Sequence, residues 1–308
     1  MVAHATTFAV VAAVALFAVC GGGARAQDMD KEDWSRFIGG GGGAGVTLLP
    51  QSDVDQLEFP LNLEYLETEF FCWSALGYGL DGIDSKLTGG GPAPIGAQIA
   101  NLTPLIRDIA TQFCYQEVGH LRAIKNTVKG FSRPQLDISA ANFGKIVDQA
   151  LNRTLNPPFN PYENSVNFLL ASYLFPYVGL TGYVGSNPKL ITPQAKKRCW
   201  GWNRRRTLLY ENATLRVESA GGVGVAELTL RNALGRKGVK DEGLVVPREQ
   251  GPEGKTTGNI IAGDRFSLAY DRTPDQVLGI VYGSGDPAKC GGFFPRCADG
   301  RIARSYIA

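Results

Sequence analysis

The sequence predicts a mainly α-helical fold, in which a four-helix bundle is followed by an irregular C-terminal extension. Apolar residues recur every three or four positions over several long stretches, as they do on the buried face of a helix. Two of these stretches begin with Thr-Pro, where threonine can cap a helix and proline fits its first turn. Residues 236–308 are instead rich in glycine and proline, which favours loops.

The composition is that of a folded protein rather than a disordered one. Hydrophobic residues make up 44% of the 308 residues, and charged residues make up 19%. The formal net charge is +2, which is too small to attract nucleic acid through bulk electrostatics. We therefore expect no nucleic-acid partner.

Residues 1–26 have the pattern of a signal peptide. Residues 8–19 form an unbroken apolar run that is too short to cross a bilayer as a helix. The triplet Ala24-Arg25-Ala26 then supplies two small residues around a cleavage site, which predicts a mature chain that begins at Gln27. No later apolar run is long and clean enough to anchor the chain, so we expect an exported protein without a transmembrane anchor.

The predicted bundle covers residues 51–235 and follows a flexible Gly-rich segment at residues 27–50. The first helix is expected over residues 54–77, with Pro60 near its start or at a kink. Residues 79–99 are rich in glycine and proline, and they predict a long loop.

Three helical stretches follow that loop. The second long helix is expected to begin at Thr103 and to end near Gly130. A short helix is expected over residues 140–151. The third long helix, over residues 164–184, is apolar on nearly all sides, which indicates a central position, and Pro176 should kink it.

The fourth helix and the C-terminal extension carry weaker signals. The fourth helix is expected to run from Thr192 toward residue 234, although residues 196–206 lack apolar periodicity. One short helix is expected in the extension, where Thr273 and Gln276 have the spacing of a capping box.

The predicted export determines how many cysteines remain in the mature chain and allows them to form disulfides. Cys20 would leave with the signal peptide, and five cysteines would remain, so at least one is free or pairs with another chain. Cys290 and Cys297 flank a short turn and could close a small disulfide loop. Cys72 and Cys114 lie on two predicted helices, and we predict that they are unpaired core residues.

Three sequons could carry N-linked glycans after export, at Asn101, Asn152 and Asn212. The sequon of Asn101 is followed by Pro104, which makes it the poorest acceptor of the three.

The residues with the clearest chemical potential are a histidine and nearby carboxylates. His120 is the single histidine left after signal cleavage, and it follows Glu117 by three residues, so both side chains project from one helix face. This is half of the Glu-x-x-His arrangement that holds iron or manganese in di-metal bundles. Glu64 and Glu67 lie among apolar residues of the first helix. If the first two long helices run antiparallel, these carboxylates and the imidazole can meet, and they would form either a shared metal site or a buried polar cluster.

Long phrases of the sequence resemble the plant desiccation-related proteins, a family with a ferritin-like domain. The phrases are LNLEYLETEFF, YQEVGHLRAIK and LLASYLFPYVGLTGYVG in the helices, with KDEGLVVPREQG and GGFFP in the extension. The resemblance covers the chain from about residue 50 to its end. It implies a ferritin-like bundle, ligand positions at Glu64, Glu117 and His120, and a non-enzymatic role in desiccation or stress. It also implies a location in the cell wall (apoplast) or the vacuole.

Two departures from the ferritin-like pattern weaken the metal site. Such sites also take a carboxylate from helix three and a second Glu-x-x-His from helix four. The Phe175-Pro176-Tyr177 region stands at the helix-three position, and RCWGWNRRR at residues 198–206 replaces an acidic segment of the family. That replacement is either a lesion in helix four or a mis-joined exon. Glu218 and Glu227 lie too far along to compensate, so we interpret the cluster as a vestigial, hydrogen-bonded remnant.

Two other functions stay open at this point. The first is a di-metal ferroxidase or oxidase that uses iron or manganese at Glu64, Glu117 and His120. The second is a cell-wall or glycan-binding module, in which the cluster Arg204, Arg205 and Arg206 contacts acidic polysaccharide or a membrane surface. A solvated basic face is the simpler interpretation of those arginines, because the net charge is close to zero.

Overall fold

The structure is a computed structural model that describes residues 49–196, 223–236, 246–257, 263–266 and 268–307. Residues Leu49–Ala308 form one compact unit. Its described parts are helical, and extended pairing there is limited to two isolated bridges. The predicted mainly α fold is therefore confirmed. The predicted signal peptide and Gly-rich segment lie outside the described residues up to residue 48.

The first predicted helix is two helices, α3 (Gln51–Glu58) and α4 (Leu61–Leu76). Pro60 lies at the break, as the sequence predicts, because proline cannot donate the hydrogen bond that would continue α3. Nearly every side chain of α4 is buried, which makes it a central helix of the bundle. Gly77, in the left-handed conformation with φ of 81°, ends α4.

The segment that follows α4 is more ordered than the predicted long loop. It contains two short helices, α5 (Leu80–Ile83) and α6 (Ser85–Thr88). The prediction of a plain loop was wrong because Leu80 and Leu87 turn inward and bury their side chains against the bundle. Two isolated leucines in a segment rich in glycine and proline give no apolar periodicity from which a helix could be predicted.

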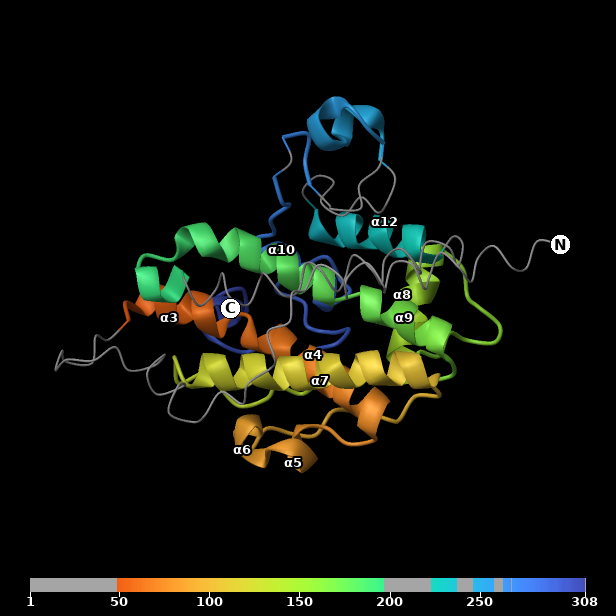
Figure 1. The fold of residues 1–308 in the computed structure, drawn as a ribbon, viewed down its shortest axis with the longest axis horizontal. Coiled ribbons are helices and arrows are strands. Elements are labelled where there is room, and N and C mark those ends of the chain that lie inside the picture. Colours follow the sequence, from red (N-terminus) through yellow and green to blue (C-terminus); the bar gives the residue numbers. More distant parts are fainter. Residues whose placement is uncertain (1–48, 197–222, 237–245, 258–262, 267, 308) are drawn as a thin grey trace, which may run out of the picture. The chain divides into compact units, whose positions relative to one another are not determined.

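The second long helix is α7 (Pro104–Lys125), and it packs along α4 (Figure 1). Pro104 occupies its first turn, as predicted. The helix ends at Lys125, before the predicted stop at Gly130. Gly130 lies in the loop after α7. Its backbone amide donates to a carboxylate oxygen of Glu58 at 2.9 Å, which ties this loop to α3.

The next predicted helices are confirmed in position and in kind. They are α8 (Ala140–Leu151), α9 (Ser165–Tyr173) and α10 (Pro176–Ser186), followed by the 3-10 turn η1 (Asn187–Lys189). Pro176 separates α9 from α10, so the predicted kink in the third long helix is present. The core between these helices and α4 is aromatic, with Phe70 of α4 in ring contact with Phe143, Phe168 and Phe175.

The third long helix also has the length and apolar composition of a membrane span. This holds for the continuous stretch Ser165–Lys189, but 72% of its most apolar window is buried inside the protein. Burial by other parts of the same chain is the pattern of a core helix, as the sequence predicts for a central position.

The predicted fourth helix is described only in part. Residues 193–196 are helical after Thr192, and α12 (Val223–Gly235) is a separate described helix, while residues 197–222 lie outside the described residues. The basic cluster at Arg204–Arg206 belongs to that undescribed stretch, as do Cys199, Asn212 and Glu218. In the described part of the chain, α12 packs against α8, α9 and α13.

The C-terminal extension contributes to the same core as the bundle. It contains η3 (Arg248–Gln250), η4 (Pro252–Gly254), α13 (Pro274–Val281) and α14 (Arg301–Arg304). The capping box of Thr273 and Gln276 is present at the start of α13, as predicted. Val277 and Phe293 belong to the central core cluster, and the Phe293 ring contacts Phe175 of the third long helix.

A buried aspartate ties α3 to the start of the fourth helix. The Asp53 carboxylate accepts hydrogen bonds from the backbone amides of Ile191, at 2.7 Å, and Thr192, at 2.9 Å, and from the Thr192 hydroxyl at 2.7 Å. Burial raises the pKa of Asp53, but these donors and the nearby Lys196 outweigh burial and lower the pKa below its ordinary value.

We expect Asp53→Ala to lower the free energy of unfolding by about 3 kcal/mol at pH 7, because it removes a buried carboxylate that accepts hydrogen bonds from two backbone amides and one hydroxyl. A carboxylate with a lowered pKa stabilises the fold above the ordinary aspartate pKa and loses that effect as pH falls through the lowered value. Urea unfolding of wild type and variant should therefore differ much less below about pH 3 than at pH 7. Equal differences at both pH values would contradict this assignment.

Candidate metal centre

The candidate site lies between α4 and α7, which run antiparallel. Glu64 near the start of α4 contacts His120 near the end of α7, and Cys72 further along α4 pairs with Cys114, earlier on α7. This is the antiparallel arrangement that a shared site requires. The two helices therefore place their apolar stripes together and bring the embedded carboxylates and imidazole face to face.

Cys72 and Cys114 form a disulfide, so the prediction that they are unpaired core residues was wrong. Both side chains are fully buried, which agrees with the core position, and their Cα atoms are 4.7 Å apart. Periodicity on each helix places a cysteine inward, but it cannot give the relative register of the two helices, and the two cysteines are 42 residues apart in sequence. The structure also pairs Cys290 with Cys297, the small loop that the spacing allowed.

Three donor groups converge in the interior: the carboxylates of Glu64 and Glu117 and the imidazole of His120. The Nδ1 atom of His120 lies 2.8 Å from an oxygen of Glu117 and 3.1 Å from an oxygen of Glu64. One ligand atom from each residue lies within 4.8 Å of the other two, and all three residues are buried. The structure thus brings together the three predicted ligand positions.

The charges of the cluster depend on one another. Burial of the ring lowers the pKa of His120, but the carboxylates of Glu117 and Glu64 outweigh burial and raise the pKa to about 10. In the absence of a cation, His120 is therefore an imidazolium at neutral pH, and its Nδ1 hydrogen is shared between the two carboxylates. A metal ion bound at Nδ1 would have to displace that proton.

The third long helix contributes a tyrosine to the site. The hydroxyl of Tyr183, on α10, donates a hydrogen bond to Oε1 of Glu64, while Oε2 of Glu64 faces His120. Tyr183 is almost fully buried, with 2% of its surface exposed. Sequence reasoning missed this residue, because a tyrosine in an apolar helix is usually part of the core.

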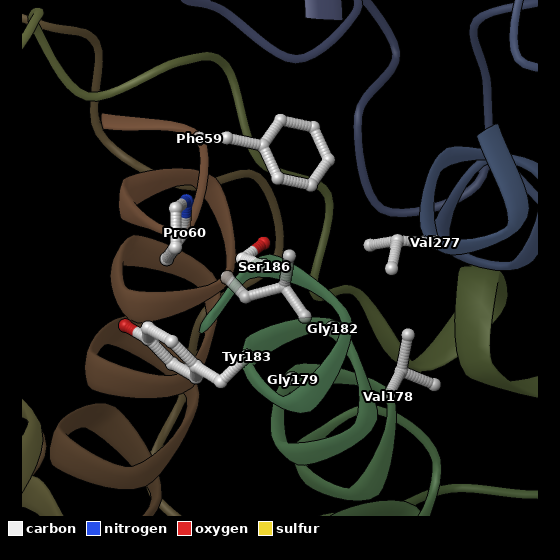
Figure 2. Close-up of a pocket in the computed structure, with 9 residues that line it drawn as sticks. Phe59, Pro60, Val178, Gly179, Gly182, Tyr183, Ser186 and Val277 are labelled. Carbon is white, nitrogen blue, oxygen red and sulfur yellow. The ribbon is translucent and has the colours of Figure 1, made fainter. Parts of the chain in front are cut away.

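A small apolar cavity adjoins the Tyr183 ring on the side of α10 and α13. Its walls include Phe59, Leu63, Val178 and Val277, and it has room for about one molecule of the size of water. Figure 2 shows the Tyr183 side chain between α10 and α4, with its hydroxyl directed toward α4. The ring therefore stands between this cavity and the carboxylate of Glu64.

The other predicted site residues lie apart from the cluster or outside the described residues. Glu67 is fully buried on α4, and Glu227 is fully buried on α12, but neither belongs to the donor group described above. Phe175, at the expected helix-three position, packs in the aromatic core. Within the described ranges, the second Glu-x-x-His half of a di-metal site is therefore not represented.

The donor set suits one divalent ion. Two carboxylates and an imidazole are N and O ligands of the kind that iron and manganese take, and the two negative charges match a divalent cation. Their convergence on His120 Nδ1 places a ligand atom of each residue around one point. The residues present therefore fit a single ion held by Glu64, Glu117 and His120.

Two of the predicted glycan acceptors are described by the structure. Asn152 follows α8 and is exposed, together with the threonine of its sequon, and Asn101 is also exposed. The backbone amide of Asn101 donates to the backbone oxygen of Tyr162 at 2.8 Å, so the backbone of that glycan acceptor is tied to a distant segment of the chain. Of these two, Asn152 is the better placed for modification.

Comparison with known proteins agrees with the ferritin-like fold. A ferritin-like domain is recognised over residues 52–200. The chain is 52% identical over 266 residues to the desiccation-related protein PCC13-62 of Craterostigma plantagineum, a match that covers 82% of this chain and 85% of that protein. It is 46% identical over 271 residues to the ferritin-like catalase Nec2 of Nesocodon mauritianus, over 83% of this chain and 86% of that protein. No solved structure matches the chain. With a ferritin-like bundle, the Glu64–Glu117–His120 cluster and these relatives, the chain belongs to the plant desiccation-related family of ferritin-like proteins.

Proposed function

We propose that this protein is an exported desiccation- or stress-related protein that holds one divalent metal ion, iron or manganese, in its bundle without di-metal turnover. The observation that carries this proposal is the convergence of Glu64, Glu117 and His120 on one buried point. The desiccation-related relative supports the stress role. The described ligands make up half of the set that a di-metal site uses, which supports a site that holds one ion rather than one that cycles two ions between oxidation states.

The roles of the residues follow from their positions. Glu64 and Glu117 supply negative charge in a water-poor interior, where an unpaired carboxylate would be costly. His120 supplies the nitrogen donor and gives up its Nδ1 proton when a cation takes that place. A bound iron or manganese ion would supply redox chemistry, and its burial between α4 and α7 would limit its contact with bulk solvent.

The direct test is the metal content of the purified full-length protein after loading with Mn²⁺ or Fe²⁺ and removal of excess ion. The proposal expects about one ion per chain, since the fit is to a single point between three donors. No metal above background would overturn it and would favour the vestigial interpretation, in which the cluster is held by hydrogen bonds alone.

A second candidate function is consumption of hydrogen peroxide, which the similarity to a ferritin-like catalase favours. In that reaction one peroxide is reduced to water while a second is oxidised to dioxygen, so two peroxides yield two waters and one dioxygen. Oxygen evolution by the metal-loaded protein, lost on treatment with a chelator, would establish this activity. Metal-bound protein that evolves no oxygen would leave the non-enzymatic role.

Export is part of the proposal, and two features support it. The apolar run at residues 8–19 has the length of a signal-peptide core, and two disulfides are compatible with an oxidising compartment. If the chain is exported in a plant cell, Asn152 should carry a glycan, because its sequon is exposed. Asn152→Gln should then abolish one glycosidase-sensitive mobility shift, while Asn101→Gln serves as the comparison with a poorer sequon. Protein with an unprocessed N-terminus and without glycans would contradict export.

A further inference from the structure

We propose that Tyr183 is the third-helix positioning residue of the metal site, and that its hydroxyl leaves Glu64 a single oxygen, Oε2, for the ion. This inference rests on the proposed metal site at Glu64, Glu117 and His120. Tyr183 is not one of these three ligands. It lies on the third long helix, where a di-metal site would have a carboxylate.

The two oxygens of Glu64 have different partners. Oε1 accepts the hydrogen bond from the Tyr183 hydroxyl, and Oε2 lies 3.1 Å from Nδ1 of His120. With Oε1 engaged by a phenol, rotation of the carboxylate about its terminal bond is restricted. Oε2 is thereby directed to the point that Glu117 and His120 also approach. Ligand carboxylates in metal sites are generally held by such outer hydrogen bonds.

The sequence of α10 explains why a tyrosine has this role. The helix reads PYVGLTGYVGS and contains no acidic residue, so it cannot supply the bridging carboxylate of a complete di-metal site. Its contribution to the cluster is the phenol of Tyr183. A neutral hydroxyl adds a hydrogen bond without adding a third negative charge to an interior that already holds two carboxylates.

The ring of Tyr183 is held in place by packing as well as by its hydroxyl. It lines the small apolar cavity with Phe59 and Val178, between α10 and α4 (Figure 2). Phenylalanine would fit the same space, so Tyr183→Phe removes the hydrogen bond to Glu64 while keeping the ring between the cavity and the cluster. The substitution therefore separates positioning of the carboxylate from packing.

The experiment compares metal affinity among full-length wild type, Tyr183→Phe and Tyr162→Phe, each stripped with chelator and titrated with Mn²⁺ against a competing chelator. Tyr162 is a matched control, since it is a buried tyrosine whose hydroxyl donates to the backbone oxygen of Ile138. We expect Tyr183→Phe to bind one ion about 10-fold more weakly than wild type, the effect typical of a lost outer hydrogen bond. The electron paramagnetic resonance spectrum of the bound Mn²⁺ should also change. Tyr162→Phe should match wild type in both measurements.

Each outcome bears on the inference. Wild-type affinity and an unchanged spectrum in Tyr183→Phe would overturn the positioning role while leaving the proposed metal site intact. Absence of binding by wild type would overturn the metal site, and this inference with it. If Tyr183→Phe does not fold, 3-fluorotyrosine incorporated at position 183 keeps the ring and strengthens donation by the hydroxyl. Unchanged affinity with that residue would equally overturn the role.

Discussion

Alanine in place of Glu117 or His120 is expected to weaken the affinity of the purified protein for Mn²⁺ about 100-fold, so that the isolated variants retain no metal above background. Each residue supplies one of the three donor groups that meet between α4 and α7. Two remaining donors cannot hold a divalent ion against water and buffer. Binding measured by chelator competition, together with the metal content of the isolated variants, checks this expectation.

The matched control for these variants is Asp108→Ala, which removes an exposed carboxylate from the same helix, α7. It should retain wild-type metal content. Binding by wild type should also weaken as pH falls, because the ion must displace the Nδ1 proton of a histidine whose pKa is about 10. Full metal content in Glu117→Ala and His120→Ala would show that metal binds elsewhere, for example within residues 197–222, and would contradict the account.

Loss of the disulfide between α4 and α7 should have the largest effect on stability. The Cys72–Cys114 bond closes a loop of 42 residues, which predicts a loss of about 4 kcal/mol in the free energy of unfolding for the Cys72→Ala, Cys114→Ala double variant. The same variant should bind metal more weakly, because the bond fixes the register of the two helices that carry all three donors. Urea unfolding without reductant measures the first effect, and chelator competition measures the second.

The second disulfide provides the control for this prediction. Cys290 and Cys297 are separated by 7 residues, so the Cys290→Ala, Cys297→Ala variant should lose about 2 kcal/mol and keep wild-type metal affinity. Equal losses in the two double variants would contradict the loop-length reasoning. Labelling of Cys72 and Cys114 by a thiol reagent in unfolded, unreduced protein would show that the bond is absent.

The sequence predicted well those features that arise within a single helix. The first three long helices and the short α8 follow from apolar periodicity, and the breaks at Pro60 and Pro176 follow from the missing amide of proline. The Glu117–His120 pair follows from helical spacing alone. Its meeting with Glu64 required one further assumption, that α4 and α7 are antiparallel neighbours.

The features that sequence reasoning missed depend on contacts between distant segments. The Cys72–Cys114 bond requires the register of α4 against α7, and the Tyr183–Glu64 hydrogen bond requires the position of α10 against α4. The buried pair of Arg133 and Glu69 is of the same kind, since it joins α4 to the loop after α7. Periodicity identifies which side chains face inward, but it does not identify the partner that each side chain meets.

The most direct test of the account is a crystal of the full-length protein soaked in Mn²⁺, with anomalous scattering recorded on both sides of the manganese edge. The account predicts one interior anomalous peak, bounded by the carboxylates of Glu64 and Glu117 and by Nδ1 of His120. An interior between α4 and α7 without such a peak, with His120 Nδ1 still hydrogen-bonded to both carboxylates, would contradict it.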